Sequence, residues 1–234
     1  MAKIITANEA ISHIKDGMSV MVGGFMGCGN AHTLVDCLSK SGVKNLTLIC
    51  NDGGLPVNPV TGEELYGVAK LIHNGQVRKM IATHVGLTPE VGQRMNDGSM
   101  EVVLIPQGSF VETIRAGGAG LGGILTPTGL GTIIEKESYV HSIVDIDGKK
   151  FLLKRALRAD VALISGHTVD KSGNVWYKGT TRCFNQMMAT AADTVIVEAD
   201  HLVEDGEILP ENVVTQGMLV DYVVKGDESL WKKA

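Results

Sequence analysis

The chain has 234 residues, of which 44% are hydrophobic and 20% are charged, and its formal net charge at pH 7 is -5. This length and composition fit a single folded domain over residues 1–234 and exclude a disordered chain. The sequence has no long cluster of Lys and Arg for a phosphate backbone and no run of about 18 apolar residues for a membrane span, so neither a nucleic acid nor a membrane is expected as a partner.

Helical patterns alternate with short apolar runs from the amino terminus to about residue 116. Thr6 and Glu9 form a capping box, which predicts a helix over 7–15 that ends at Asp16-Gly17. The apolar runs that predict buried strands are 18–22, 46–50, 77–83 and 102–105. Further helices are predicted from about residue 31 and over 64–73, 89–96 and 109–116. Strands separated by helices of this length predict an α/β fold with three α/β/α layers around a mostly parallel open sheet.

The segment 117–131 interrupts the alternation, because it holds seven glycines and one proline. It is expected to form an extended loop, and loops of this length usually serve a function or an interface. Asp147-Gly148 predicts a hairpin between 142–146 and 151–153. The remaining elements are predicted strands over 161–165, 194–197 and 220–224 and a predicted helix over 185–192.

The loop Gly23–Gly29 lies between a predicted strand and a predicted helix. Free backbone N–H groups and the helix dipole favour an anion at such a position, and glycine permits close approach of a ligand. A plain tight turn explains the same residues equally well. A second glycine pattern, at Gly118, Gly120 and Gly123, follows a helix instead of a strand, so it does not match a dinucleotide fingerprint and indicates a mobile or interface loop.

Asn51, Asp52 and Gln107 come just after predicted parallel strands. Ligands of open α/β sheets bind outside the carboxyl ends of the strands, so Asn51 and Gln107 are candidate binding residues. Turn capping, a common role of Asn and Asp, is the alternative. The seven histidines and four cysteines show no metal-ligand spacing, and no nucleophile motif occurs, so no bound metal is expected. Free cysteines and the lack of a signal-peptide pattern predict a cytoplasmic protein.

Several long motifs run through the chain, at 16–29, 106–108, 114–123, 126–132, 158–164 and 184–185. Together they resemble the α subunit of the family I, or 3-oxoacid type, CoA-transferases over nearly the whole chain. The segment 177–181 is most similar to the butyrate–acetoacetate and acetate branch of that family. Two positions differ from the usual pattern, because Ala31 and Gln216 stand where the family usually has proline.

The resemblance implies an enzyme that transfers CoA between a short acyl-CoA and a free carboxylate such as acetoacetate, butyrate or acetate. In the family, the reaction is ping-pong through a glutamyl-CoA intermediate, and the glutamate lies in a Ser-Glu-Asn-Gly motif of a separate β subunit. That motif is absent from this sequence, so a β subunit that carries it is the implied partner. CoA and acyl-CoA are implied as substrates, with no permanently bound cofactor.

The resemblance also implies roles for single positions. Gln107 matches the family glutamine that stabilises the oxyanion, and Asn51 matches a residue of the acyl or carboxylate pocket. The stretch usually assigned to CoA matches Gly24, Phe25, Met26, Gly27, Cys28, Gly29 and Asn30. Two other functions stay open, namely a sugar-phosphate isomerase of similar fold, with phosphate in the loop Gly23–Gly29, and a non-catalytic module that binds an anionic effector there.

Overall fold

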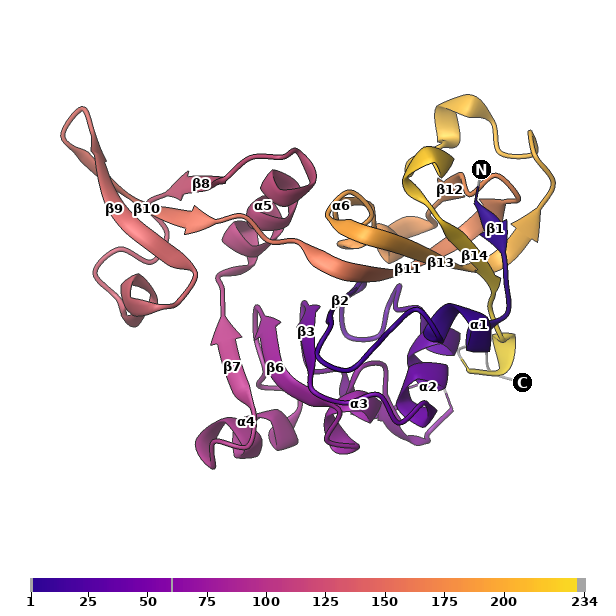
Figure 1. Cartoon of the computed structure of the whole chain (residues 1–234), viewed down its shortest axis with the longest axis horizontal. Coiled ribbons are helices and arrows are strands. Elements are labelled where there is room, and N and C mark those ends of the chain that lie inside the picture. The colour runs from indigo at the N-terminus through magenta and orange to yellow at the C-terminus, as the bar shows by residue number, and fades with distance from the viewer. Residues whose placement is uncertain (1, 60, 231–234) are drawn as a thin grey trace.

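The computed structural model describes residues 2–59 and 61–230. Within these residues the main sheet has nine strands in the order β1-β14-β13-β11-β2-β3-β6-β7, with β12 paired to β11 (Figure 1). These strands are β1 (Lys3–Ile4), β2 (Ser19–Val22), β3 (Leu46–Cys50), β6 (Val77–Ala82), β7 (Glu101–Leu104), β11 (Ala159–Asp170), β12 (Val175–Trp176), β13 (Ala192–Val203) and β14 (Tyr222–Lys225). Every pair along the order is parallel, and the β11–β12 pair is antiparallel. The prediction of a mostly parallel sheet is confirmed.

Helices cover both faces of this sheet. They are α1 (Ala7–Ile11), α2 (His32–Lys40), α3 (Ala69–His73), α4 (Pro89–Asn96), α5 (Gln107–Gly118) and α6 (Asn185–Met188). Val20 and Val22 of β2 belong to one apolar cluster with α1 to α4, whereas Met21 between them belongs to a second cluster with α5 and α6. Successive side chains of a strand point to opposite faces, so the two clusters are the two sides of the sheet. The three-layer α/β/α arrangement is confirmed (Figure 1).

A smaller sheet extends from one end of the molecule (Figure 1). Its strands lie in the order β8-β10-β9, with β8 at Gly123–Thr126, β9 at Val140–Ile146 and β10 at Lys149–Arg155. The hairpin predicted at Asp147-Gly148 is confirmed, and both residues have the positive φ angles that a tight hairpin turn requires. The prediction of an extended loop over 117–131 is wrong for two segments of this range. The helix α5 continues to Gly118, and β8 satisfies its backbone groups by pairing with β10.

Three predicted helices differ from the structure. The first ends at Ile11, and α6 ends at Met188 because the chain soon enters β13. The helix expected over 64–73 begins only at Ala69, since its first residues form a strand that pairs with an earlier one. Leu65 and Gly67 have positive φ angles, which an α-helix does not allow. Pairing with another segment therefore overrode the helical pattern.

Short elements complete the fold. An antiparallel ribbon is formed by β4 (Leu55–Val57) and β5 (Glu64–Tyr66). The 3-10 helices are η1 (Ile133–Lys136), η2 (Gly179–Arg182), η3 (Pro210–Asn212), η4 (Gly217–Leu219) and η5 (Glu228–Leu230). None of the helices in the described ranges has the length and apolar character needed to cross a membrane.

Candidate active site

Four segments meet at the carboxyl ends of neighbouring strands. The loop 23–31 follows β2, Asn51 follows β3, Thr83 follows β6 and Gln107 comes after β7. These four strands are adjacent in the sheet, so the segments gather where ligands of open α/β sheets bind. Gln107 Nε2 donates a hydrogen bond to Asn51 Oδ1 at 3.0 Å. The two residues that the sequence singles out separately are therefore in direct contact.

Gln107 is the first residue of α5, which begins two residues earlier than predicted. Pro106 precedes it as the N-cap, and the proline ring limits the backbone conformations before the helix. The Gln107 side chain is exposed, and its NH₂ group carries a second hydrogen that makes no hydrogen bond in the described part of the chain. Gln107 therefore presents one free amide donor at the sheet edge.

Asn51 lies behind Gln107 and holds it in place. The residue is 1% exposed, and its Nδ2 donates to Asp52 Oδ2 at 3.1 Å. A carboxylate only accepts hydrogen bonds, so this contact fixes the amide orientation and turns Oδ1 toward Gln107 and Thr83. In this arrangement the hydrogen bonds of the Asn51 side chain go to protein groups, and they fix the direction of the Gln107 amide.

The glycine loop is tied to the end of β3 and is bonded internally. Asp52 accepts hydrogen bonds from Met26 N at 2.8 Å and from Gly54 N at 2.9 Å. The other loop amides that donate within the protein are those of Gly23, Gly24, Phe25, Cys28 and Asn30, whereas the amides of Gly27 and Gly29 make no hydrogen bond in the described part of the chain. The expectation of free N–H groups for an anion is therefore wrong at the bonded positions, because their donors already have acceptors.

The glycines of this loop allow close packing against protein groups. A Cβ on Gly27 would overlap the Tyr66 ring, and a Cβ on Gly29 would overlap the Thr181 backbone. Both glycines also have positive φ angles, 82° and 75°, in the region that favours glycine. Packing within the protein thus explains these two glycines without a ligand.

The side chains of the loop differ in exposure. Cys28 is exposed, whereas Phe25 is half-buried and packs against His84 with ring centroids 5.8 Å apart. Asn30 is buried, and its Nδ2 donates to Gly23 O. Of these side chains, that of Cys28 is the most accessible to a ligand.

The carboxylate of a buried glutamate caps the amino terminus of α2. Ala31, the N-cap, has no side-chain acceptor, and Glu198 of β13 instead accepts hydrogen bonds from Thr33 N at 3.1 Å, Thr33 Oγ1 at 2.8 Å and Leu34 N at 3.0 Å. Burial raises the pKa of the Glu198 carboxyl to about 7. Because these N–H groups already have an acceptor, this helix end offers no site for an external phosphate. Sequence reasoning missed Glu198, since it lies 165 residues from Thr33 and no local pattern joins them.

Asn185 joins the glycine loop to the segment before α6. It is fully buried, and its Nδ2 donates to Gly29 O at 2.9 Å and to Thr181 O at 2.8 Å. Its Oδ1 accepts from Ser165 N at 3.1 Å. Sequence reasoning also missed this role, although Phe184-Asn185 is one of the motifs that carry the family resemblance.

His32 holds the loop from another side. Its Nε2 lies 2.8 Å from Gly27 O, which can only accept, so the ring hydrogen is on Nε2. The ring stacks on Tyr66 with centroids 4.5 Å apart. Burial lowers the pKa of His32 from 6.5 to about 4. His32 is therefore neutral at pH 7, and its hydrogen bond fixes the position of the Gly27 carbonyl.

The contribution of His32 to the stability of the protein is expected to decrease as the pH falls from about 6.5 to about 4. In this range the unfolded state binds a proton at His32 and the folded state does not, so the stabilisation is complete above pH 6.5 and decreases below it. The expected loss of this contribution between pH 7 and pH 5 is about 2 kcal/mol. The raised pKa of Glu198 acts in the opposite direction over this range, so the His32 contribution is measured as the difference between wild type and His32→Gln in urea unfolding at both pH values. His32→Gln keeps a donor for Gly27 O and should lack this part of the pH dependence. The same pH dependence in both proteins would contradict the prediction.

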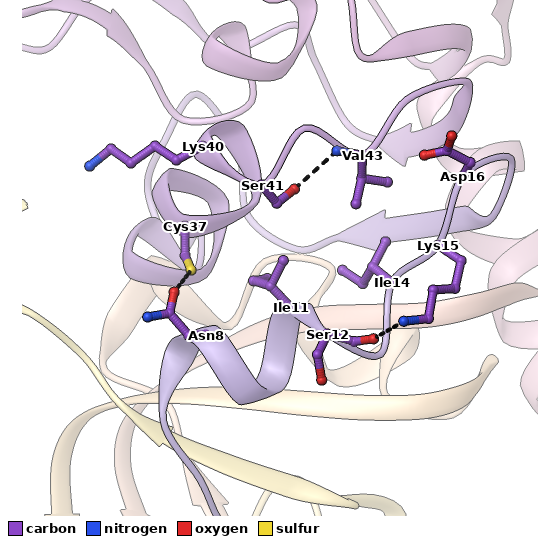
Figure 2. Close-up of a pocket in the computed structure, with 10 residues that line it drawn as sticks. All are labelled: Asn8, Ile11, Ser12, Ile14, Lys15, Asp16, Cys37, Lys40, Ser41 and Val43. Carbon is purple, nitrogen blue, oxygen red and sulfur yellow. Dashed lines mark hydrogen bonds between the residues drawn. The ribbon is translucent and has the colours of Figure 1, made fainter.

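A separate hollow of about 510 Å³ lies between α1 and α2 (Figure 2). Val43 lines it and precedes β3, so the hollow lies at the amino ends of the strands, opposite the candidate active site. Both of its lysines are engaged, because Lys15 Nζ donates to Ser12 O and Lys40 pairs with Asp36. The hollow is therefore not part of the site.

The site can stabilise negative charge on an oxygen but has no activated nucleophile. Its free side-chain donor is the Gln107 amide, and its carboxylate, Asp52, is buried and accepts two backbone hydrogen bonds. The exposed Cys28 thiol contacts a threonine hydroxyl instead of a base. No group of three or more His, Cys, Asp or Glu side chains in the described ranges is arranged to hold a metal ion. Such a site suits acyl transfer in which the attacking group comes from elsewhere.

Known proteins resemble this chain over nearly its whole length. The family described as coenzyme A transferase matches residues 4–226. The chain is 48% identical over 227 residues to the acetate CoA-transferase subunit alpha of Escherichia coli (strain K12), a match that covers 97% of this chain and 98% of that subunit. It is also 48% identical over 224 residues to the acetoacetyl-CoA:acetate/butyrate CoA transferase alpha subunit of Clostridium acetobutylicum, covering 96% of this chain and 98% of that subunit.

Solved structures share the fold. An acyl-CoA transferase of Escherichia coli O157:H7, in a thioester complex with CoA, has a TM-score of 0.83 and 24% identity, covering 96% of this chain but only 47% of the longer one. Glutaconate coenzyme A-transferase from Acidaminococcus fermentans has a TM-score of 0.84 and 19% identity, covering 98% of this chain and 77% of that one. With the family match over residues 4–226 and two α subunits at 48% identity, the chain belongs to the coenzyme A transferase family.

Proposed function

We propose that this chain is the α subunit of a short-chain acyl-CoA:carboxylate CoA-transferase that acts on acetoacetate, butyrate and acetate. The observation that carries the proposal is the exposed Gln107 amide, which buried Asn51 holds at the carboxyl edge of the sheet. Two relatives at 48% identity support the substrate class, because one is an acetate CoA-transferase subunit and the other an acetoacetyl-CoA:acetate/butyrate CoA transferase subunit.

In the proposed reaction the nucleophile is a glutamate of a separate β subunit, in a Ser-Glu-Asn-Gly motif that this sequence lacks. Its carboxylate attacks the acyl-CoA thioester, and the tetrahedral intermediate expels CoA thiolate to leave an acyl-glutamyl anhydride. The thiolate then attacks the glutamyl carbonyl, which releases the first carboxylate and forms a glutamyl-CoA thioester. The acceptor carboxylate takes up CoA by the same steps in reverse.

Gln107 donates its free N–H to the oxyanion at each tetrahedral stage. The hydrogen bond strengthens as charge develops on the oxygen, so it lowers the barrier more than it stabilises the bound substrate. Asn51 contributes by fixing the direction of that donor beside the acyl pocket. The stretch 24–30 contacts CoA, and Cys28 is its exposed side chain.

The contacts of the glycine loop count against the two alternative functions. A sugar-phosphate isomerase or an anion-binding effector module would need free donors in Gly23–Gly29 or at the start of α2. Five of the seven amides of Gly23–Gly29 are bonded within the protein, which leaves those of Gly27 and Gly29, and Glu198 accepts from the amides of Thr33 and Leu34 at the start of α2. The transferase does not depend on those donors, because its reacting carbonyl lies at Gln107.

The proposal includes one domain and a cytoplasmic location. A single sheet carries both apolar clusters, which supports one folding unit. The four cysteines are free thiols, which fits a reducing compartment. No permanently bound cofactor is part of the reaction, because CoA enters and leaves as a substrate.

An assay of the assembled complex tests this function. The chain, purified with a β subunit that carries the Ser-Glu-Asn-Gly glutamate, is expected to form acetoacetyl-CoA from butyryl-CoA and acetoacetate. Initial-rate plots are expected to show the parallel lines of a ping-pong reaction. A complex whose β glutamate is replaced by glutamine is the control. An intact complex without CoA exchange would reject the proposal.

The small sheet is expected to be covered by the β subunit. Leu121 and Leu125 are 51% and 43% exposed, and Ile143 and Ile146 are exposed on the neighbouring hairpin. Apolar groups gathered on a projecting sheet indicate a contact surface. Chymotrypsin is therefore expected to cleave beside Leu121 and Leu125 in the isolated chain and much more slowly in the complex. Cleavage beside exposed Met218, outside this sheet, is the internal control, and equal cleavage at Leu121 with and without the partner would count against this surface.

A further inference from the structure

The amino terminus of α5 is open, in contrast to that of α2. Its N-cap, Pro106, has no side-chain acceptor, and no acceptor in the described part of the chain meets the N–H groups of residues 107–109. Unpaired N–H groups at a helix start carry partial positive charge and attract an anion. At the start of α2, by contrast, the Glu198 carboxylate accepts hydrogen bonds from the N–H groups. The start of α5 therefore has donors without acceptors.

A buried lysine lies next to this helix start. Lys154 of β10 is 1% exposed, and within residues 2–59 and 61–230 its Nζ makes one hydrogen bond, to Ser109 Oγ at 3.4 Å. Ser109 is the third residue of α5 and is itself buried. Burial lowers the pKa of Lys154, because the ammonium loses water. The ammonium and the helix start, two positive centres, thus lie close together, and Lys154 makes no ion pair in the described part of the chain.

A groove of about 570 Å³ opens at the same place, between α5 and β8, which lie next to each other in Figure 1. Gly108 and Ser109 line it from the first turn of α5. Leu121, Ile124 and Leu125 also line it and give it apolar walls. The groove therefore combines donors with apolar surface, as a site for a small amphipathic anion does.

Lys154 does not line the groove itself but contacts it through Ser109, and the charged side chains that do line it give Lys154 no counter-ion. Glu112 lines the groove, but its Oε2 pairs with Arg115 Nε at 2.8 Å, and both side chains are about half exposed to water. Because Lys154 Nζ donates to Ser109 Oγ, the hydroxyl hydrogen of Ser109 remains available as a donor. An anion in the groove can accept this hydrogen bond together with those of the helix start.

We propose that this groove binds the carboxylate of a short-chain acid, with the Ser109 hydroxyl and the N–H groups at the start of α5 as donors. The Lys154 ammonium supplies the compensating charge, and Leu121 and Leu125 contact the alkyl chain. The site rests on the proposed function, because short-chain carboxylates are the acceptors of that reaction. Gln107 begins the same helix, so the bound acid lies beside the residue proposed to stabilise the oxyanion.

Calorimetric titration with sodium butyrate at constant ionic strength tests the site, on the full-length chain and on its complex with the β subunit. Butyrate is expected to bind, and 1-butanol, which has the same chain length without the charge, is not. Lys154→Met removes the ammonium and should weaken butyrate binding at least about tenfold, as for a lost charged interaction. Lys154→Arg should stay within a few-fold of wild type. Lys150→Met, at an exposed position on the same strand, is the matched control and should bind like wild type.

A second measurement locates the ligand. The backbone amide NMR signals of Gly108 and Ser109 are expected to shift with butyrate in the wild-type chain and not in Lys154→Met. Melting of Lys154→Met without butyrate checks its folding, and Ser109→Ala, which removes the hydroxyl donor, should also weaken binding. Unchanged butyrate affinity in folded Lys154→Met, or equal binding of butyrate and 1-butanol, would overturn the site.

The partner subunit and the enzyme activity give separate outcomes. Butyrate binding that the isolated chain shows and the complex loses would overturn the proposal in favour of a carboxylate side chain of the β subunit at Lys154. A complex that exchanges CoA but binds no butyrate at this groove would reject the site and leave the proposed function intact. A complex that binds butyrate here but exchanges no CoA would reject the proposed function instead.

Discussion

Replacing Gln107 by alanine is expected to lower kcat of the assembled enzyme by about 10²–10³, or roughly 2.7–4 kcal/mol of transition-state stabilisation. The side chain presents one unpaired amide N–H at the sheet edge, and Asn51 fixes its direction before substrate binds. Such a donor interacts more strongly with the oxyanion than with the ground-state carbonyl. The KM for acyl-CoA should therefore change far less than kcat.

Two other variants make this test specific. Gln107→Glu is expected to be at least as damaging, because its carboxylate repels the oxyanion and faces the acceptor Oδ1 of Asn51. Gln93→Ala, at an exposed glutamine on α4, is the matched control and should keep the wild-type kcat. Assembly with the β subunit and the melting temperature show whether each variant is folded. A folded Gln107→Ala complex with kcat within a few-fold of wild type would remove Gln107 from the mechanism.

The isolated chain is expected to show no CoA-transferase turnover at all. Covalent transfer needs a carboxylate that can attack the thioester, and the carboxylate of the candidate site, Asp52, is buried with both oxygens accepting backbone hydrogen bonds. The glutamate motif of the family is absent from the sequence. We therefore expect the complex to depend on the β subunit for its nucleophile.

Butyryl-CoA and acetoacetate, incubated with the chain alone and then with added β subunit, measure this dependence. Acetoacetyl-CoA is expected only after the partner is added. Asp52→Asn in the complex is an informative companion, because it removes the carboxylate of this chain and should leave the glutamyl-CoA intermediate detectable on the β subunit. Robust turnover by the chain alone would contradict the assignment of the nucleophile to the partner.

Several elements were predictable from the sequence because their contacts are local. The capping box is present, with Thr6 Oγ1 accepting from Glu9 N and the Glu9 carboxylate accepting from Thr6 N. The hairpin at Asp147-Gly148 formed because its two residues suit positive φ angles. The helix over 89–96 and the strand over 46–50 match the predicted bounds, since proline suits the first turn of the helix and a short apolar run specifies the strand.

The contact between Asn51 and Gln107 was also within reach of the sequence. Residues that follow parallel strands share one edge of a sheet, so two such residues can be expected near each other. Their hydrogen bond shows that β3 and β7 end close enough for side chains to meet across β6. The chemical roles of both residues remain proposals that the kinetic tests address.

The sequence by itself determined the alternation of strands and helices, the parallel sheet and its loop-bearing edge, because these depend on periodicity and on caps within a few residues. Only the tertiary structure decided which groups satisfy the backbone at that edge. Glu198 caps α2 from 165 residues away, and Asn185 bonds to Gly29 from 156 residues away. Buried Lys154 likewise contacts Ser109 of α5 from 45 residues away. The partner of a buried donor or charge is the group that the chain topology brings near it. The neighbouring residues in the sequence therefore do not predict that partner.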